Sequence, residues 1–204
     1  MLVMEHGLRE RKKRQTRTAL VRAALELCEA KGVEHVTVGE IAEAANVSRR
    51  TFFNYFSSRE EAILGGGAQR GELLAACLAG RPVDESVWDA LRAAFADFLA
   101  SDEEPEREWL ARARLVRASP SLIAQQRMDY AQMENRLVAE VARRTHTDAD
   151  ALTPRVIVAS AVAAMRVAVN HWIDTPTEPH SLAEVIDGAM ARVGAGFAVD
   201  VRHP

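Results

Sequence analysis

The spacing of apolar residues along the whole chain is the feature that most restricts its fold. Apolar side chains recur three and four positions apart, and runs that alternate between apolar and polar residues are scarce. A spacing of three and four gathers side chains on one face of an α-helix, whereas alternation would indicate a β-strand. With 204 residues, of which 48% are hydrophobic, the chain can bury a sizeable core. We therefore predict an all-α protein.

Charge is distributed unevenly along the chain. Residues 1–60 carry 11 Lys and Arg against 8 Asp and Glu, whereas the remaining 144 residues carry 15 against 21. The stretch "RERKKRQTR" concentrates six of these cations, namely Arg9, Arg11, Lys12, Lys13, Arg14 and Arg17. A basic end on an acidic body indicates a polyanionic partner for that end alone.

The sequence favours a cytoplasmic protein without a membrane partner. Its two cysteines, Cys28 and Cys77, are too few for a disulfide framework and fit a reducing compartment. The N-terminus lacks the apolar segment of a signal peptide. The longest apolar run, "VIVASAVAAM", is stopped by Arg166, so we expect it to be too short to span a bilayer.

Four helices are predicted in the N-terminal part, over residues 8–31, 38–45 and 49–55 and in a longer element that starts at Ser57 or Ser58. Thr37 can cap the second helix together with Glu40, in a capping box. Asn46 suits a left-handed turn, and Ser48 can cap the third helix. Two short helices joined by such a tight turn form a helix-turn-helix pattern.

The third helix carries chemistry suited to DNA. If Phe52 and Phe56 point inward, the side chains that point outward are those of Arg49, Arg50, Phe53 and Asn54. Arginine can contact guanine in the major groove, and asparagine can pair with adenine. An exposed phenylalanine on such a helix is unusual unless it meets thymine methyl groups or sugars. The alternative is a solvated helical hairpin whose arginines only maintain solubility.

The stretch "TVGEIAEAANVSRRTFFNYFSSREEAIL" resembles the DNA-binding domain of the TetR family of bacterial transcriptional regulators, and the resemblance covers about residues 10–64. It implies a three-helix DNA-binding head, a fourth linking helix, and a larger helical domain for ligand binding and dimerisation. We accordingly place a DNA-binding domain at residues 1–64 and a ligand-binding and dimerisation domain at residues 65–204.

The same resemblance implies roles for individual residues. Thr37, Tyr55 and Arg59 would contact phosphates, while Arg49, Arg50, Thr51 and Asn54 would read bases. The predicted DNA-binding set is Thr37, Ser48, Arg49, Arg50, Thr51, Phe53, Asn54, Tyr55 and Arg59. Three positions differ from the usual pattern, with Asn46 for a glycine, Arg59 for a lysine and Phe53 for a tyrosine. The last difference removes a phosphate-contacting hydroxyl and leaves an apolar contact.

A helix at residues 155–173 is apolar nearly all round, which indicates burial on more than one side. Its small residues, among them Ala161, Ala164 and Ala168, would let a partner helix approach closely. Together with the helix after Ser181, it would build a four-helix interface in a homodimer. The alternative is a core formed wholly within one protomer.

An effector site is predicted from large side chains in the middle of the chain, supplied by Trp88, Phe95, Phe98, Trp109 and Met133. Arg112 could meet an anionic group of the ligand. The pattern "RARLVRASPSL" is similar to the C-terminal domain of the mycofactocin-type TetR subgroup of actinobacteria, which implies an effector such as an acyl-CoA. The alternative for these residues is plain core packing with solvated charges.

Motifs for catalysis, cofactors or metals are not convincing. "GGGAQRGEL" has glycines near phosphate-loop spacing, but Glu72 stands where a lysine is required. "HTDAD", at residues 146–150, is better explained as a cap-rich loop than as a metal site. The predicted function is a ligand-responsive regulator that represses from a palindromic operator as a homodimer. Activation, regulation without a ligand, or an enzyme or carrier on the same scaffold are the alternatives.

Overall fold

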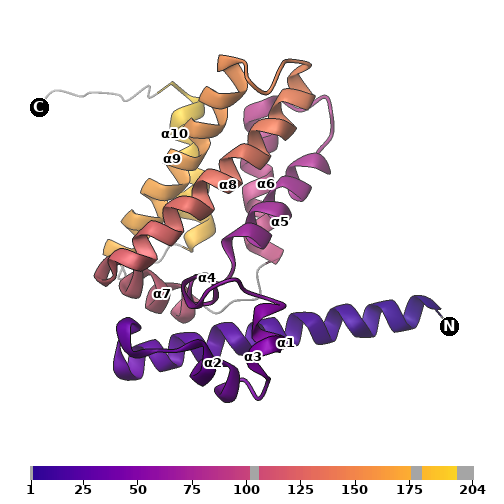
Figure 1. Cartoon of the computed structure of the whole chain (residues 1–204). Coiled ribbons are helices and arrows are strands. Elements are labelled where there is room, and N and C mark those ends of the chain that lie inside the picture. Colours follow the sequence, from indigo (N-terminus) through magenta and orange to yellow (C-terminus); the bar gives the residue numbers. More distant parts are fainter. Residues whose placement is uncertain (1, 102–105, 176–180, 197–204) are drawn as a thin grey trace, which may run out of the picture. The chain divides into compact units, whose positions relative to one another are not determined.

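The computed structural model of the protein describes residues 2–101, 106–175 and 181–196, and within these ranges it contains α-helices and one short 3₁₀ turn but no strand (Figure 1). The all-α prediction is confirmed. The elements are α1 (Leu2–Lys31), the 3₁₀ turn η1 (Val33–His35), α2 (Val38–Ala44), α3 (Arg49–Phe53), α4 (Arg59–Ile63), α5 (Gly67–Ala79), α6 (Val87–Ser101), α7 (Glu106–Ala118), α8 (Pro120–Thr145), α9 (Leu152–Asp174) and α10 (Leu182–Gly194).

The chain divides into two compact units, and it passes between them three times. The first unit comprises residues 1–67 and 104–128, and the second comprises residues 68–103 and 129–204. The predicted boundary at residue 64 lies close to the first crossing. Sequence reasoning did not anticipate that α7 and the first turns of α8 belong to the first unit.

The first unit is built on α1, which packs against α2, α4 and α7. Its core is formed by apolar side chains from these helices, from α3 and from the start of α8, among them Leu20, Ile41, Phe52, Ile63 and Leu122, each of which is fully buried. An exposed ion pair of 3.2 Å joins Arg22 of α1 to Glu108 of α7. The segment 104–128 is therefore a structural part of this unit.

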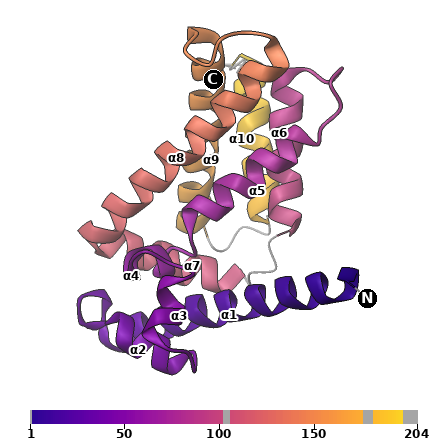
Figure 2. The same cartoon turned by 45° about the vertical axis from the view of Figure 1, so that its right-hand side comes forward.

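The second unit is a helical bundle in which α9 and α10 lie side by side, with α6 next to α10 (Figures 1 and 2). Its core buries Leu91, Phe95, Leu137 and Val158. Ala164, which we expected at an open dimer interface, is only 7% exposed within a single protomer. That expectation is wrong, because the alanine stripe of α9 packs inside the bundle, as Ala161 and Ala168 also do.

Helix α9 is, among the described residues, the one helix long and apolar enough to cross a membrane by length and composition. Sequence reasoning had excluded a span because of Arg166. Val158, Val162 and Trp172 of α9 are buried in the second unit, and a core helix of this kind satisfies the same criterion.

The long fourth helix that we predicted is interrupted at two glycines. Gly65 and Gly66 have φ angles of 78° and 77°, in the left-handed region that favours glycine. Helix α4 therefore ends at Ile63, and α5 begins at Gly67. The first two glycines of the stretch "GGGAQRGEL" thus break the predicted helix.

The start of α2 is fixed by a network around Glu40. The side chain of Thr37 accepts a hydrogen bond from the Glu40 backbone amide, and the Thr37 amide donates to the Glu40 carboxylate at 2.9 Å. The capping box predicted from sequence is therefore confirmed. Lys31 at the end of α1 also donates to this carboxylate. The hydrogen bonds from Lys31 and then Thr37 lower the pKa of Glu40 from 4.5 to about 2.

We predict that Glu40 makes the stability of the protein depend on acidity. Because its pKa is lower in the folded chain, the unfolded chain takes up a proton first, and the stabilisation is lost as pH falls from about 4.5 to about 2. The melting temperature of Glu40→Gln should lie below that of the wild type at pH 7, and the difference should shrink over this window. A difference that stays constant from pH 7 to pH 2 would contradict the assignment.

Candidate nucleic-acid interface

The turn between α2 and α3 holds the two helices in a helix-turn-helix arrangement. Asn46 adopts a φ of 54°, as predicted for its left-handed position, and the amide of Val47 donates to the Ala42 carbonyl at 2.8 Å. Ser48 then caps α3, since its hydroxyl accepts from the Thr51 amide at 3.0 Å. Thr51 is held in turn, because its hydroxyl lies 2.8 Å from that of Ser48.

Helix α3 presents one face to the core and the other to solvent. Phe52 and Phe56 are fully buried, and their ring centroids lie 5.8 Å apart. Arg50, Phe53 and Asn54 are consequently exposed. The inward and outward assignment made from the sequence is confirmed. The outer face can offer guanidinium and amide donors beside an apolar ring.

Arg49 is exposed, but its side chain does not extend freely from α3. A Cβ atom added to Gly39 of α2 would lie 2.3 Å from Nη2 of Arg49, so the guanidinium lies directly over this glycine. The two residues line an open hollow of about 360 Å³ together with Glu43 and Asn46. Sequence reasoning missed Gly39, although a glycine inside a capped helix is the signal that could have drawn attention to it.

The three predicted phosphate contacts make bonds within their own unit. Nη1 of Arg59 donates to the carbonyls of Val33 at 3.0 Å and Val36 at 2.8 Å, and Nε donates to Glu60 at 2.8 Å. Thr37 is engaged by the capping box, and Tyr55 packs half-buried against the core. Phosphate binding by these residues stays a prediction, whereas their part in shaping the unit is visible.

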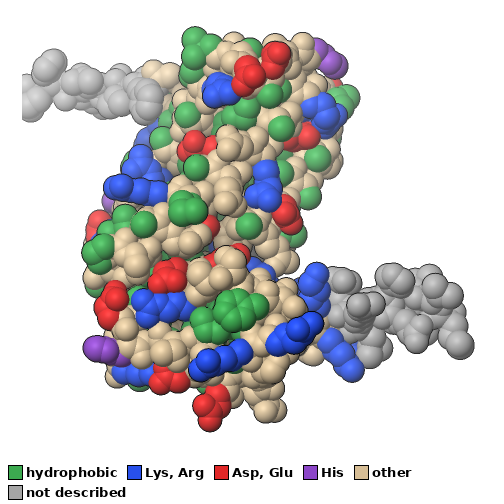
Figure 3. Space-filling model, in the orientation of Figure 1, with side chains coloured by type: hydrophobic (Ala, Val, Ile, Leu, Met, Phe, Trp, Pro, Cys, Tyr) green, Lys and Arg blue, Asp and Glu red, His purple; other side chains and the backbone are tan. Residues whose placement is uncertain are grey.

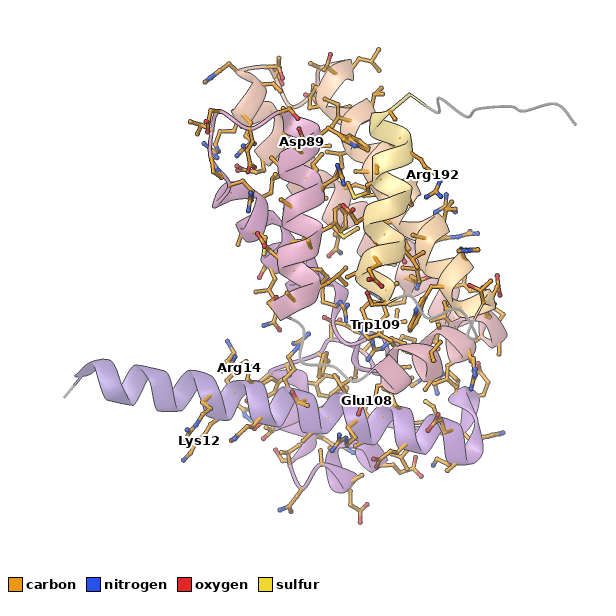
Figure 4. The ribbon with its side chains drawn as sticks, turned by 180° about the vertical axis from the view of Figure 1, so that it is seen from behind. Lys12, Arg14, Asp89, Glu108, Trp109 and Arg192 are labelled. Carbon is orange, nitrogen blue, oxygen red and sulfur yellow. The ribbon has the colours of Figure 1, made fainter. Side chains whose placement is uncertain are left out.

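The basic run of α1 divides into two parts. Arg11, Lys12, Lys13 and Arg14 are exposed, and the described residues contain no ion pair with them. Figure 4 shows Lys12 and Arg14 leaving opposite sides of α1. In the space-filling view, Lys and Arg side chains gather over the first unit and flank an apolar patch (Figure 3). Arg9 lies among the side chains that the structure does not describe.

Arg17 differs from the exposed cations before it, because it is half-buried and makes contacts within its own unit. Its guanidinium lies 4.4 Å from the centroid of the Phe56 ring and donates to the Gly65 carbonyl at 3.2 Å. A Cβ atom at Gly66 would lie 1.5 Å from Nη2 of Arg17, so the glycine is required for this approach. Arg17 thereby ties α1 to the end of α4.

Arg112, predicted to bind the effector, also lies at the end of α4. It is 5% exposed, and its Nε donates to the Ile63 carbonyl at 2.9 Å. The carbonyl end of a helix carries partial negative charge, so a cation is favourable there. The guanidinium lies 5.9 Å from the Trp109 ring, and both residues belong to the first unit. Its visible role is that of a cap for α4.

The other four predicted effector contacts belong to the second unit. Trp88 donates from Nε1 to the Met190 carbonyl at 3.0 Å, and Phe95 is buried. Phe98 is also buried, whereas Met133 is partly exposed and packs against the same core. The structure therefore does not gather the six predicted contacts within a single unit.

Sequence reasoning missed polar groups in the core of the second unit. Arg70 lies with its Cζ 5.4 Å from the Phe98 ring centroid, and Asp129 is buried. Burial raises the pKa of Tyr130, an effect that the nearby charges of Arg70 and Arg166 oppose. A charged residue that interrupts the apolar face of a helix, as Arg70 does in α5, is the signal that could have found them.

Metal and thiol chemistry find little support in the residues that the structure describes. No three His, Cys, Asp or Glu side chains among them gather in a way that could hold a metal ion. Both cysteines are free thiols. Burial raises the pKa of Cys28 to about 11, so this thiol is protonated at neutral pH and a poor nucleophile.

Comparisons with known proteins agree with this geometry. Residues 20–63 match the family described as bacterial regulatory proteins, tetR family, and residues 85–198 match the MftR C-terminal domain. The chain is 37% identical to the HTH-type transcriptional regulator TcmR of Streptomyces glaucescens over 97% of its own length and 91% of that protein. The chain belongs to the TetR family. It is a TetR-family transcriptional regulator with a DNA-binding helix-turn-helix.

Further relatives support the same assignment. The mycofactocin biosynthesis transcriptional regulator MftR of Mycobacterium tuberculosis is 30% identical, over 85% of this chain and 87% of that protein. The structure of Thermus thermophilus FadR, a TetR-family repressor in complex with lauroyl-CoA, matches with a TM-score of 0.50 and 25% identity, over 92% of this chain and 98% of that one. A TetR-family structure from Mesorhizobium loti shares the fold, with a TM-score of 0.55 and 20% identity over 90% and 95% of the two chains.

We predict that Gly39→Ala separates DNA affinity from stability. The new methyl group must displace the end of Arg49, while loss of a helical glycine stabilises the fold by up to about 1 kcal/mol. Operator binding should weaken by about 1–3 kcal/mol if Arg49 reads a base from this position. Affinity is measured by fluorescence anisotropy, and stability by urea unfolding.

Gly188→Ala is the matched control for this variant. Gly188 also lies in a helix beneath an arginine, since a Cβ atom there would be 3.3 Å from Nη1 of Arg192, but it belongs to the second unit. It should change stability without changing DNA affinity. Unaltered DNA affinity in Gly39→Ala would show that the position of Arg49 over Gly39 has no part in binding.

Proposed function

We propose that the protein is a homodimeric repressor that binds a palindromic operator and leaves it when an amphipathic effector such as an acyl-CoA binds. The observation that carries the DNA-binding part is the outer face of α3, where Arg50, Phe53 and Asn54 are exposed because Phe52 and Phe56 occupy the core. One such helix per protomer, repeated by a two-fold axis, reads a palindrome. We place this activity in the cytoplasm, with the DNA.

Exposed cations on α1 support binding to the phosphate backbone. Arg11, Lys12, Lys13 and Arg14 are all exposed, and Lys12 and Arg14 leave opposite sides of α1, so the run offers cations on more than one side of the helix. Each phosphate neutralised by such a cation releases counterions and adds to the salt dependence of binding. These residues therefore contribute affinity without sequence preference.

An apolar stripe on α9 supports a dimer. Val156 is 51% exposed and Val167 is 60% exposed, and Ala159 and Ala163 lie between them at helical spacing. The face opposite this stripe is buried in the protomer, which leaves the stripe for a second copy of the chain. The interface is thus proposed for the same helix as before, but for a different face from that of Ala164.

The core of the second unit supports an amphipathic effector. Phe98, Tyr130 and Met133 provide apolar and aromatic surface, and Arg70 places a cation beside it. A site of this composition suits an apolar chain with an anionic group. The Thermus thermophilus FadR structure contains lauroyl-CoA, which makes acyl-CoAs the first class to test.

We predict that Val167→Arg weakens the dimer. A charge placed in an apolar contact loses its hydration without gaining a partner, which is costly. Sedimentation velocity should show monomers at concentrations where the wild type is dimeric. Val83→Arg is the control, because Val83 is also strongly exposed, at 86%, but lies outside any helix. A variant as dimeric as the wild type would exclude this stripe as the interface.

We predict that acyl-CoAs release the protein from its operator. The operator is first identified by selecting bound sequences from random duplexes, and acyl-CoAs of several chain lengths are then titrated against the complex. Coupling of about 1–3 kcal/mol would lower operator affinity some 5–150-fold, and DNA must weaken effector binding by the same factor. The effector would favour a spacing of the two α3 helices other than the 34–36 Å that matches successive major grooves.

The same titration separates the alternatives. Selection that enriches no sequence would contradict the DNA-binding assignment. Acyl-CoA binding without loss of operator affinity would contradict regulation by this ligand, and absence of binding at every chain length would exclude the ligand class. Tighter operator binding with ligand would instead identify a protein whose DNA binding the ligand strengthens.

A further inference from the structure

Phe53 is an aromatic side chain left in solvent on the outer face of α3. It is 57% exposed, and it is the one strongly exposed aromatic ring among the residues whose burial the structure describes. Removing such a ring from water is favourable, so a partner that covers it gains binding free energy. A phenylalanine has no hydrogen-bonding group, so the contact must be apolar.

The ring of Phe53 is held in place before any partner arrives. It stands edge-on to Phe52, with centroids 5.4 Å apart and an angle of 87° between the ring planes. The backbone around it is also fixed, because the amides of Tyr55 and Phe56 both donate to the Phe52 carbonyl, at 2.9 and 3.0 Å. A partner therefore meets a ring that loses little freedom on binding.

The surroundings of this ring define the charge of the partner. Arg49, Arg50 and Asn54 flank it in the sequence and are exposed, and no acidic residue occurs between residues 44 and 59. The surface therefore combines cationic and amide donors with one apolar ring. It fits a polyanion that carries hydrogen-bond acceptors and a small apolar group side by side.

The major groove of DNA has this combination. Guanine and adenine edges offer acceptors to arginine and asparagine, and the 5-methyl of thymine is the apolar group on the edges of the base pairs. Uracil lacks that methyl group, and the major groove of an RNA duplex is too deep and narrow for side chains to read. The DNA duplex is thus the occupant that the composition of this surface favours.

We propose that Phe53 reads the 5-methyl group of one thymine in each operator half-site. This rests on the proposed binding of α3 in the major groove. The ring would act as a specificity residue, so the operator should contain a thymine at one fixed position beside the bases read by the arginines. Phe53 would then discriminate thymine from uracil, which presents the same hydrogen-bonding groups and lacks only the methyl group.

The test replaces each thymine of the selected operator in turn by deoxyuridine, which deletes only the methyl group. At one symmetric position, the substitution should weaken wild-type binding about fourfold per half-site, or about 15-fold for both, from the burial of one methyl group. Phe53→Ala should bind the thymine operator more weakly and show no difference between thymine and deoxyuridine at that position. An operator with cytosine at that position should also bind the wild type more weakly. Replacing this cytosine by 5-methylcytosine should restore part of the affinity, because the methyl group returns.

Two controls keep the result interpretable. Arg50→Ala should weaken binding yet keep the penalty for deoxyuridine, because the methyl contact remains. Since Phe53 is exposed, Phe53→Ala should melt within about 2 °C of the wild type, so that any loss of affinity arises at the interface.

The experiment distinguishes loss of the methyl contact from absence of DNA binding. If an operator is found but deoxyuridine has no effect at any thymine, or the same effect in Phe53→Ala, the methyl contact is refuted while the regulator assignment stands. A second outcome would also overturn the proposal. If Phe53→Ala lowers affinity equally for the thymine operator and for every deoxyuridine-substituted operator, and the wild type shows no effect of deoxyuridine, Phe53 contacts the sugar-phosphate backbone.

Discussion

The burial of two rings, that of Phe52 on the very short helix α3 and that of Phe56 just after the helix, is the constraint on which the DNA-binding surface depends. Helix α3 spans five residues, and a helix of this length is not stable in water by itself. Full burial of Phe52 and Phe56 contributes about 1.5–3 kcal/mol each, which offsets the cost of ordering the helix. The outward side chains of α3 face solvent because these two rings point inward.

The remaining supports of this surface are polar, and each one satisfies a helix end. Ser48 caps α3, Thr37 and Glu40 cap α2, and Arg59 binds the carbonyls that precede α2. Helix ends leave backbone groups unpaired, so a domain assembled from short helices needs many such caps. Thr37 and Arg59, whose residue types suit DNA contacts, therefore use their polar groups to satisfy helix ends.

Local features of the fold could be predicted from the sequence because local signals determine them. The spacing of Phe52 and Phe56, the capping box at Thr37 and the left-handed turn at Asn46 all depend on residues within a few positions of one another. The break after α4 was missed, although Gly65 and Gly66 are visible in the sequence, because the segments on both sides of the glycines are typical of helices.

Contacts between distant segments could not be predicted in this way. Arg112 caps a carbonyl 49 residues earlier in the chain, and Arg17 reaches a carbonyl 48 residues later. Nothing local distinguishes these arginines from solvated ones. The open face of α9 was misjudged for a related reason, since small residues such as Ala164 suit a contact within a protomer as well as one between protomers.

The first unit is formed by two separate stretches of the chain, which limits how this unit can be exchanged between regulators. A fragment that ends near residue 67 would lose the Arg112 guanidinium from the Ile63 carbonyl and the side chains of Val116 and Leu122 from the core. A chimera joined at the first crossing would replace these partners with those of another protein. Portable DNA recognition from this scaffold therefore requires transplanting two separate stretches, residues 1–67 and 104–128, as one cassette.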